Sequence, residues 1–141
     1  MQYALKAVGP HGAVVGIDRD ALDKPLPGAR VLRGDIYATS DGELLGDLAA
    51  FDVVLSDMAP DTTGVRATDQ ARSAALFEEA LARAERLLAP TGAFVGKIFQ
   101  GPDLEAIRKR MAARFAEVKT LKPDSSRAQS IEIYLAGKGF T

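Results

Sequence analysis

Apolar residues gather in short blocks along this chain, and polar segments separate the blocks. Four of the blocks are rich in Val, Ile, Leu and Phe and are almost continuously apolar. That pattern is typical of strands that are buried on both faces of a parallel sheet. We predict a strand at each block, at residues 13–17, 30–32, 51–56 and 93–99.

The segment between the third and fourth predicted strands has the spacing of an amphipathic helix. Its apolar residues recur every three or four positions and therefore share one face of a helix. This stripe consists of Phe77, Leu81, Ala84 and Leu88. Thr68 or Asp69 can cap the start of the helix, and the helix should stop before Pro90. A helix between two such strands predicts a βαβ crossover.

The remainder of the chain predicts a second helix and a hairpin. The helix follows Pro102, and one of its faces is basic. The basic residues are Arg108, Lys109, Arg110 and Arg114. Two strands follow, at about residues 116–121 and 131–136, and the polar segment between them is short enough for an antiparallel hairpin.

Strands that alternate with helices predict an α/β fold. We predict a Rossmann-like sheet that is mostly parallel and has an antiparallel strand at its C-terminal end. The 141 residues, of which 47% are hydrophobic, suffice for one core, so we predict a single domain over residues 1–141.

Composition narrows the classes of function. The net charge is −1, so any contact with a polyanion must come from a local basic face. The chain has no cysteine and one histidine, which excludes disulfides and thiolate metal sites, and we predict no metal. There is no apolar run of the roughly 20 residues that span a bilayer and no signal-peptide pattern at Met1. We therefore expect a soluble cytoplasmic protein that does not contact membranes.

Acidic residues end three of the predicted strands or follow them closely: Asp18, Asp35 and Asp57. In a doubly wound sheet the carboxyl ends of the strands form the ligand crevice. Asp18 can accept hydrogen bonds from the hydroxyls of a ribose, although a helix cap is an alternative. Asp35 can accept one from an adenine amino group, but an Asp that bonds to the backbone of its own turn is the commoner case.

Three charged residues occupy apolar strands or their ends. Asp57 sits at the tip of a strand, and Lys97 lies inside one, where an unpaired lysine is costly unless it snorkels to water. Glu132 lies in an alternating segment, and for that residue alone the solvent face is the favoured interpretation. If the three meet in one cleft, Lys97 can take a proton from a hydroxyl nucleophile. Asp57 and Glu132 would then orient the ammonium of Lys97 and the substrate.

In order and spacing, several motifs of this chain resemble the FtsJ/RrmJ-type ribose 2'-O-methyltransferases, which use S-adenosylmethionine to methylate RNA. The resemblance is strongest to the bacterial enzymes that act on large-subunit (23S) ribosomal RNA. It extends from about Val8 to the end of the chain. The motifs are residues 14–18, 33–35, 52–60, 63–64, 96–101 and 122–127, followed by Glu132.

The resemblance implies residue roles. The catalytic Asp of the family falls on Asp57, the general-base Lys on Lys97 and the family's Glu on Glu132. Asp18, Asp35 and Asp57 would contact the methyl donor. The partner would be ribosomal RNA or the large ribosomal subunit, and the basic helix and residues 122–127 would face its phosphates.

In the family, a first strand and a Gly-rich turn that holds the cofactor precede the part that this chain matches, as does a segment that supplies another catalytic lysine. We therefore expect an incomplete family domain, with an unpaired gap in the sheet between the strands that end at Asp18 and Asp57. Two alternatives are a non-catalytic RNA-binding or assembly module and an inactive fragment that retains the fold. An unrelated nucleotide-binding domain is disfavoured because the chain lacks a Gly-x-Gly-x-x-Gly turn.

Overall fold

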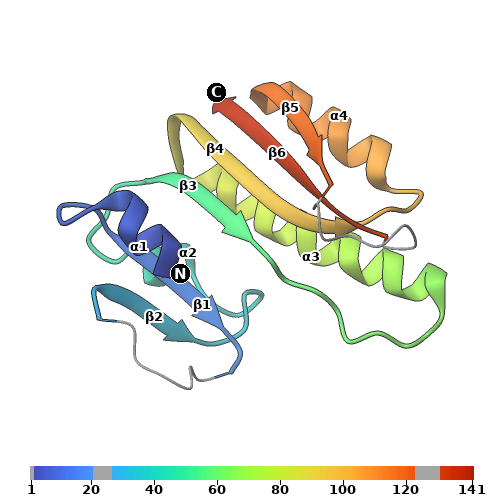
Figure 1. Ribbon diagram of the computed structural model, residues 1–141, viewed down its shortest axis with the longest axis horizontal. Helices are drawn as coiled ribbons and strands as arrows, with labels where there is room; N and C mark the ends of the chain where they lie inside the picture. The colour runs from blue at the N-terminus through green and yellow to red at the C-terminus, as the bar shows by residue number, and fades with distance from the viewer. Residues whose placement is uncertain (1, 21–26, 123–130) are drawn as a thin grey trace. The chain divides into compact units, whose positions relative to one another are not determined.

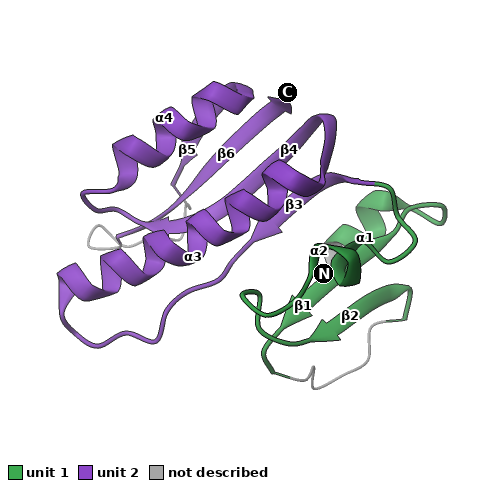
Figure 2. Ribbon diagram, turned by 180° about the vertical axis from the view of Figure 1, so that it is seen from behind, with its two compact units in different colours: residues 1–49 green, residues 50–141 purple. Residues whose placement is uncertain are grey.

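The computed structural model describes residues 2–20, 27–122 and 131–141. The described residues form two compact units, residues 1–49 and 50–141 (Figure 2). The predicted single-domain organisation stays a prediction. Apart from Lys122, the predicted turn between the last two strands lies outside the described residues.

The first unit contains a two-stranded parallel sheet and two helices. In chain order its elements are α1 (Gln2–Val8), β1 (Val14–Asp18), β2 (Ala29–Arg33) and α2 (Asp41–Leu45). The parallel register pairs Val14 with Ala29 and Asp18 with Arg33. The two strands therefore end at the same edge.

Helix α2 was not predicted, because it is too short to show an apolar period. Its start is a capping box: Ser40 Oγ accepts from the Glu43 amide at 3.1 Å, and Glu43 Oε2 accepts from the Ser40 amide at 2.9 Å. A Ser followed three residues later by a Glu is a helix-start signal that the sequence did carry.

The second unit contains a four-stranded sheet and two helices. Its elements are β3 (Phe51–Ser56), α3 (Arg66–Leu87), β4 (Leu88–Phe99), α4 (Leu104–Arg114), β5 (Phe115–Leu121) and β6 (Glu132–Phe140). The strand order is β3-β4-β6-β5; β3 and β4 are parallel, and β6 is antiparallel to both of its neighbours. Strands β3, β4 and β5 thus share one direction, which confirms the mostly parallel α/β sheet with a reversed C-terminal strand.

Within the described residues, β1 is hydrogen-bonded only to β2, and β3 only to β4. The two pairs of strands therefore belong to two separate sheets, one in each unit. In a separate finding, no helix of the described part of the chain is long and apolar enough to cross a membrane.

Helices α3 and α4 cover the same face of the four-stranded sheet (Figures 1 and 2). Between the helices and the sheet lies one cluster of buried apolar side chains. Its members are Ala74, Phe77, Ala80, Leu81, Ala84, Leu88, Phe94, Ile98, Ile107, Met111, Phe115, Ile133, Leu135 and Phe140. The predicted stripe of α3 is part of this cluster, although Leu88 already belongs to β4.

The predicted cap of α3 was wrong. The helix begins at Arg66, and Val65 occupies the N-cap position without a capping hydrogen bond from its side chain. Asp69 therefore lies inside the first turns of the helix, where its carboxylate bonds to the preceding loop and not to the helix amides.

Strand β6 extends to Phe140, four residues beyond the predicted end, and it includes Gly137, which packs against an aromatic ring. A Cβ on Gly137 would come within 2.7 Å of the Phe115 ring. The same constraint applies at Gly96 on β4, where a Cβ would lie 2.6 Å from Phe77. Both glycines let an aromatic ring lie directly against the sheet.

Candidate active site

The face of the four-stranded sheet away from α3 and α4 carries Lys97. Side chains alternate between the two faces of a strand, so Phe94 and Ile98 point into the helical core while Lys97 points to the other face. The antiparallel register places Tyr134 of β6 opposite Lys97. The Lys97 side chain is only 14% exposed. Its ammonium therefore needs a partner.

Asp57 is that partner. It directly follows β3, and the parallel register that pairs Ser56 with Gly96 brings the next residue of each strand together. Lys97 Nζ lies 3.2 Å from Asp57 Oδ1, and the Tyr134 hydroxyl donates to the same oxygen at 3.0 Å. The Asp57 side chain is 75% exposed, so this site is open to solvent on the carboxylate side.

Tyr134 serves as a donor in this arrangement. Partial burial, followed by its hydrogen bond to Asp57, raises the pKa of the Tyr134 hydroxyl above its ordinary value. The phenol therefore stays protonated near neutrality and cannot itself be the base. Among these three side chains, the Lys97 amine and the Asp57 carboxylate remain as groups that could accept a proton from a substrate hydroxyl.

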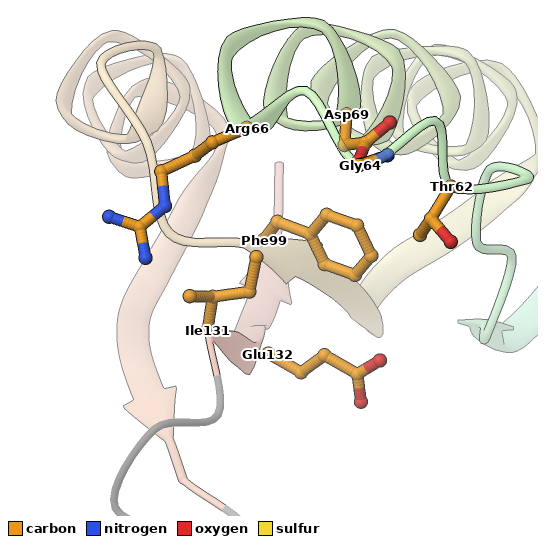
Figure 3. A pocket seen from close by; sticks show the side chains of 7 residues that line it. All are labelled: Thr62, Gly64, Arg66, Asp69, Phe99, Ile131 and Glu132. Atoms are coloured by element: carbon orange, nitrogen blue, oxygen red, sulfur yellow. The ribbon is translucent and has the colours of Figure 1, made fainter.

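Glu132 lies one step further along β6. The register pairs it with Phe99, and it shares the face of Tyr134, two residues or about 7 Å away along the strand. Glu132 lines a cavity of about 390 Å³ (Figure 3). Of the three charges predicted to share a cleft, Lys97 and Asp57 thus form an ion pair, and Glu132 belongs to the adjoining cavity.

Asp69 also lines this cavity, and sequence reasoning gave it no role beyond a helix cap. Its side chain is buried, with 7% of the residue exposed. Its carboxylate accepts from the Thr63 amide at 2.8 Å, the Thr63 hydroxyl at 2.9 Å and the Gly64 amide at 3.2 Å. Gly64 has φ +84°, a conformation that favours glycine. Asp69 therefore fixes the loop that connects Asp57 to α3.

These hydrogen bonds, first among them the one from the Thr63 amide, hold the pKa of Asp69 below its ordinary value of 3.8. A carboxyl whose pKa is lowered by folding stabilises the native state fully above its unfolded pKa, and this contribution is lost as the pH falls through the folded pKa. We expect Asp69→Asn to unfold at a lower temperature at neutral pH. We also expect its melting temperature to fall less than that of the wild type on acidification below about pH 4.

Thermal unfolding followed by circular dichroism over a pH series tests this expectation. Asp61→Asn is the matched control, because Asp61 is an exposed acid in the same loop. The control should follow the wild-type curve. Equal acid sensitivity of Asp69→Asn and wild type would show that the Asp69 carboxylate does not stabilise the loop.

Asp18 and Asp35 belong to the first unit, and both are exposed. Asp18 is the last residue of β1, and Asp35 follows the end of β2 by two residues. Asp18 Oδ1 accepts from the Asp20 amide at 3.0 Å, and Asp35 Oδ1 accepts from the Tyr37 amide at 2.9 Å. The Gly34 amide donates to the Asp18 carbonyl at 2.8 Å, which joins the two strand ends. The turn bond considered for Asp35 is therefore present, and the two carboxylates share one edge of the small sheet.

The basic helix α4 lies on the other face of the sheet from Lys97. Its charges are also partly matched within the unit. Arg110 and Arg114 both pair with Glu85 of α3, and Arg108 pairs with Glu105 at 3.6 Å. Two of the four basic residues, Arg110 and Arg114, thus link α4 to α3, and the helix covers the face of the sheet away from Lys97.

No group of three or more His, Cys, Asp or Glu side chains that could hold a metal ion occurs among residues 2–20, 27–122 and 131–141. The chemistry that the described residues offer at Lys97 is that of a positioned amine, a carboxylate and a phenol.

The described sheet is a mixed α/β sheet with a reversed last strand, which is the fold class of the methyltransferase that superposes on this chain. The model of the FtsJ-like methyltransferase family matches residues 1–140, and the chain belongs to that family. Methyl transfer requires a methyl donor.

Two curated relatives carry the name Ribosomal RNA large subunit methyltransferase E. The one from Syntrophobacter fumaroxidans is 48% identical, over 97% of this chain and 71% of its own length. The one from Desulfatibacillum aliphaticivorans is 45% identical, over 97% of this chain and 67% of its own length. A solved structure described as a ribosomal RNA methyltransferase from Plasmodium falciparum superposes with a TM-score of 0.83 at 25% identity, covering 99% of this chain and 79% of that one.

Proposed function

We propose that this chain transfers a methyl group from S-adenosylmethionine to a ribose 2'-hydroxyl of large-subunit ribosomal RNA, with Lys97 as the general base. The observation that carries the proposal is the Lys97 amine, mostly buried and held 3.2 Å from Asp57 at the carboxyl end of β4. The family supplies the reaction class, and the names of the relatives support ribosomal RNA as the substrate.

The residues act as follows in this proposal. Lys97 takes the proton of the ribose hydroxyl, for which it must be neutral when the hydroxyl arrives. Asp57 holds the amine in place, and Tyr134 keeps Asp57 in place through its hydrogen bond. Glu132, on the same face of β6, would orient the ribose. Because the amine is already held in place before the substrate binds, the reaction does not have to lose the entropy of positioning it.

S-adenosylmethionine supplies an electrophilic methyl group when it is bound. Asp18 and Asp35 fit its nucleoside, because exposed carboxylates at the ends of parallel strands accept hydrogen bonds from ribose hydroxyls and amino groups. Asp57, whose side chain is largely exposed, is the third residue that we assign to the donor.

The test combines donor binding with methyl transfer. Calorimetric titration with S-adenosylmethionine should show saturable binding. The protein should then move labelled methyl groups into naked large-subunit RNA or into large ribosomal subunits. A 2'-O-methyl group blocks alkaline cleavage of the RNA, so we expect the label in alkali-stable dinucleotides. Label in mononucleotides would instead mean that a base is methylated, and a folded protein that transfers no label would contradict the proposal.

A further inference from the structure

The cavity beside Glu132 lies entirely within the second unit and has a volume of about 390 Å³. The side chains of Phe99 and Ile131 lie between Arg66 on one side and Thr62 and Glu132 on the other (Figure 3). An apolar surface is thus bordered by a cation, a hydroxyl and a carboxylate. Of the residues that have a role in the proposed reaction, Glu132 alone lines this cavity.

We propose that this cavity is a subsite for the base of the nucleotide that is methylated. The inference rests on the proposed function, because it assumes that a ribose hydroxyl is presented to Lys97. A nucleobase combines a flat apolar face with hydrogen-bond donors and acceptors at its edge, and proteins bind unstacked RNA bases through both. Phe99 and Ile131 match the face, and Glu132, Arg66 and Thr62 match the edge.

The register of the sheet places the cavity next to the ion pair. Lys97 pairs with Tyr134, and Phe99 pairs with Glu132, so the two sites lie two residues, or about 7 Å, apart along the strands. In a ribonucleotide, the carbon that carries the base is bonded to the carbon that carries the 2'-hydroxyl. A hydroxyl at Lys97 therefore brings its own base within reach of the cavity.

One wall of the cavity is fixed before any ligand binds. The loop residue Gly64 lines it, and the Asp69 carboxylate holds the Gly64 and Thr63 amides. A preformed wall lowers the ordering cost of binding, which favours capture of a single base by a small site. Arg66 follows directly at the start of α3 and is exposed. Its guanidinium can therefore reach a ligand without disturbing the core.

The protein is small enough for amide-resolved NMR, which reports binding at the cavity itself. We would titrate it with AMP, GMP, CMP and UMP, and with ribose 5-phosphate as the probe that lacks a base. At least one nucleotide should shift the amide signals of Thr62, Gly64 and Ile131 saturably, while ribose 5-phosphate should leave them unchanged. Arg66→Ala should weaken this binding about tenfold, the effect expected of a good contact to a base edge.

Arg86→Ala is the matched control, because Arg86 is an exposed arginine at the other end of the same helix and does not line the cavity. It should bind the nucleotides as the wild type does. Equal shifts with ribose 5-phosphate would overturn the base subsite in favour of a phosphate contact. The absence of saturable shifts at the three cavity amides, or unchanged affinity in Arg66→Ala, would also overturn it.

These outcomes can be separated from a failure of the proposed function. Methyl transfer to RNA without nucleotide binding at the cavity would refute the subsite and leave the function standing. Base-dependent binding at the cavity without methyl transfer would refute the function and retain the subsite as a base-binding site.

Discussion

Replacing Lys97 with Ala should abolish methyl transfer while S-adenosylmethionine binds with nearly unchanged affinity. A general base contributes about a hundredfold to ten-thousandfold to the rate, and its loss acts on the nucleophile and not on the donor. We expect single-turnover methyl transfer to fall by that factor. Donor affinity, measured by calorimetry, should stay within about twofold of the wild type.

Three further variants complete this experiment. Lys97→Met retains most of the apolar stem and separates the loss of the amine from any loss of packing. Lys138→Ala removes an exposed lysine from β6 of the same sheet and should remain fully active. Asp57→Ala should impair both donor binding and turnover, because the proposal gives Asp57 a role in each. Wild-type activity in Lys97→Ala would refute the assignment of Lys97 as the base.

Replacing Phe77 with Ala should strongly destabilise the second unit. Phe77 is 1% exposed and meets Phe94 edge to face, with 5.4 Å between the ring centroids and 77° between the planes. Truncating a buried Phe to Ala costs about 3–5 kcal/mol, a large share of the about 5–15 kcal/mol by which a domain is stable. The cavity cannot close easily, because the Phe77 ring lies against the backbone at Gly96.

Equilibrium unfolding in urea measures this loss. Leu55→Ala on β3 is the control, because Leu55 is 66% exposed and a surface substitution should change the free energy of unfolding by no more than about 0.5 kcal/mol. Phe77→Leu keeps more of the volume and should lose less, so it provides a measurable variant if Phe77→Ala does not fold. A loss below about 1 kcal/mol in Phe77→Ala would mean that the core repacks around the site.

The local pattern of the sequence was sufficient for most elements. Continuous apolar blocks predicted β1 to β4 within one to a few residues at their ends, apart from the longer start of β4, and helical spacing predicted α3 and α4. These signals are local because the apolar residues that one strand or helix buries recur with the period of that element. Helix α2 was missed because five residues are too few to show such a period.

For two sets of charged residues, the local pattern did not show which groups they contact in the folded protein. Asp69 was predicted as a helix cap because its position fits one, yet its carboxylate bonds to Thr63 and Gly64 in the loop. The basic residues of α4 were predicted to face RNA, which stays a prediction, but the spacing did not show that Arg110 and Arg114 also pair with Glu85 on another helix. In both cases the partner of a charge was set by packing and not by sequence spacing.

The sequence by itself determined the α/β class, the positions of the acidic strand ends and the anomaly of Lys97, because a lysine in an apolar strand is costly wherever it occurs. Only the tertiary structure decided what Lys97 meets. The register of β3 with β4 and of β4 with β6 brings Asp57 and Tyr134 to its amine from positions far apart in the chain. Strand register depends on the packing of whole sheets, so no local signal contains it.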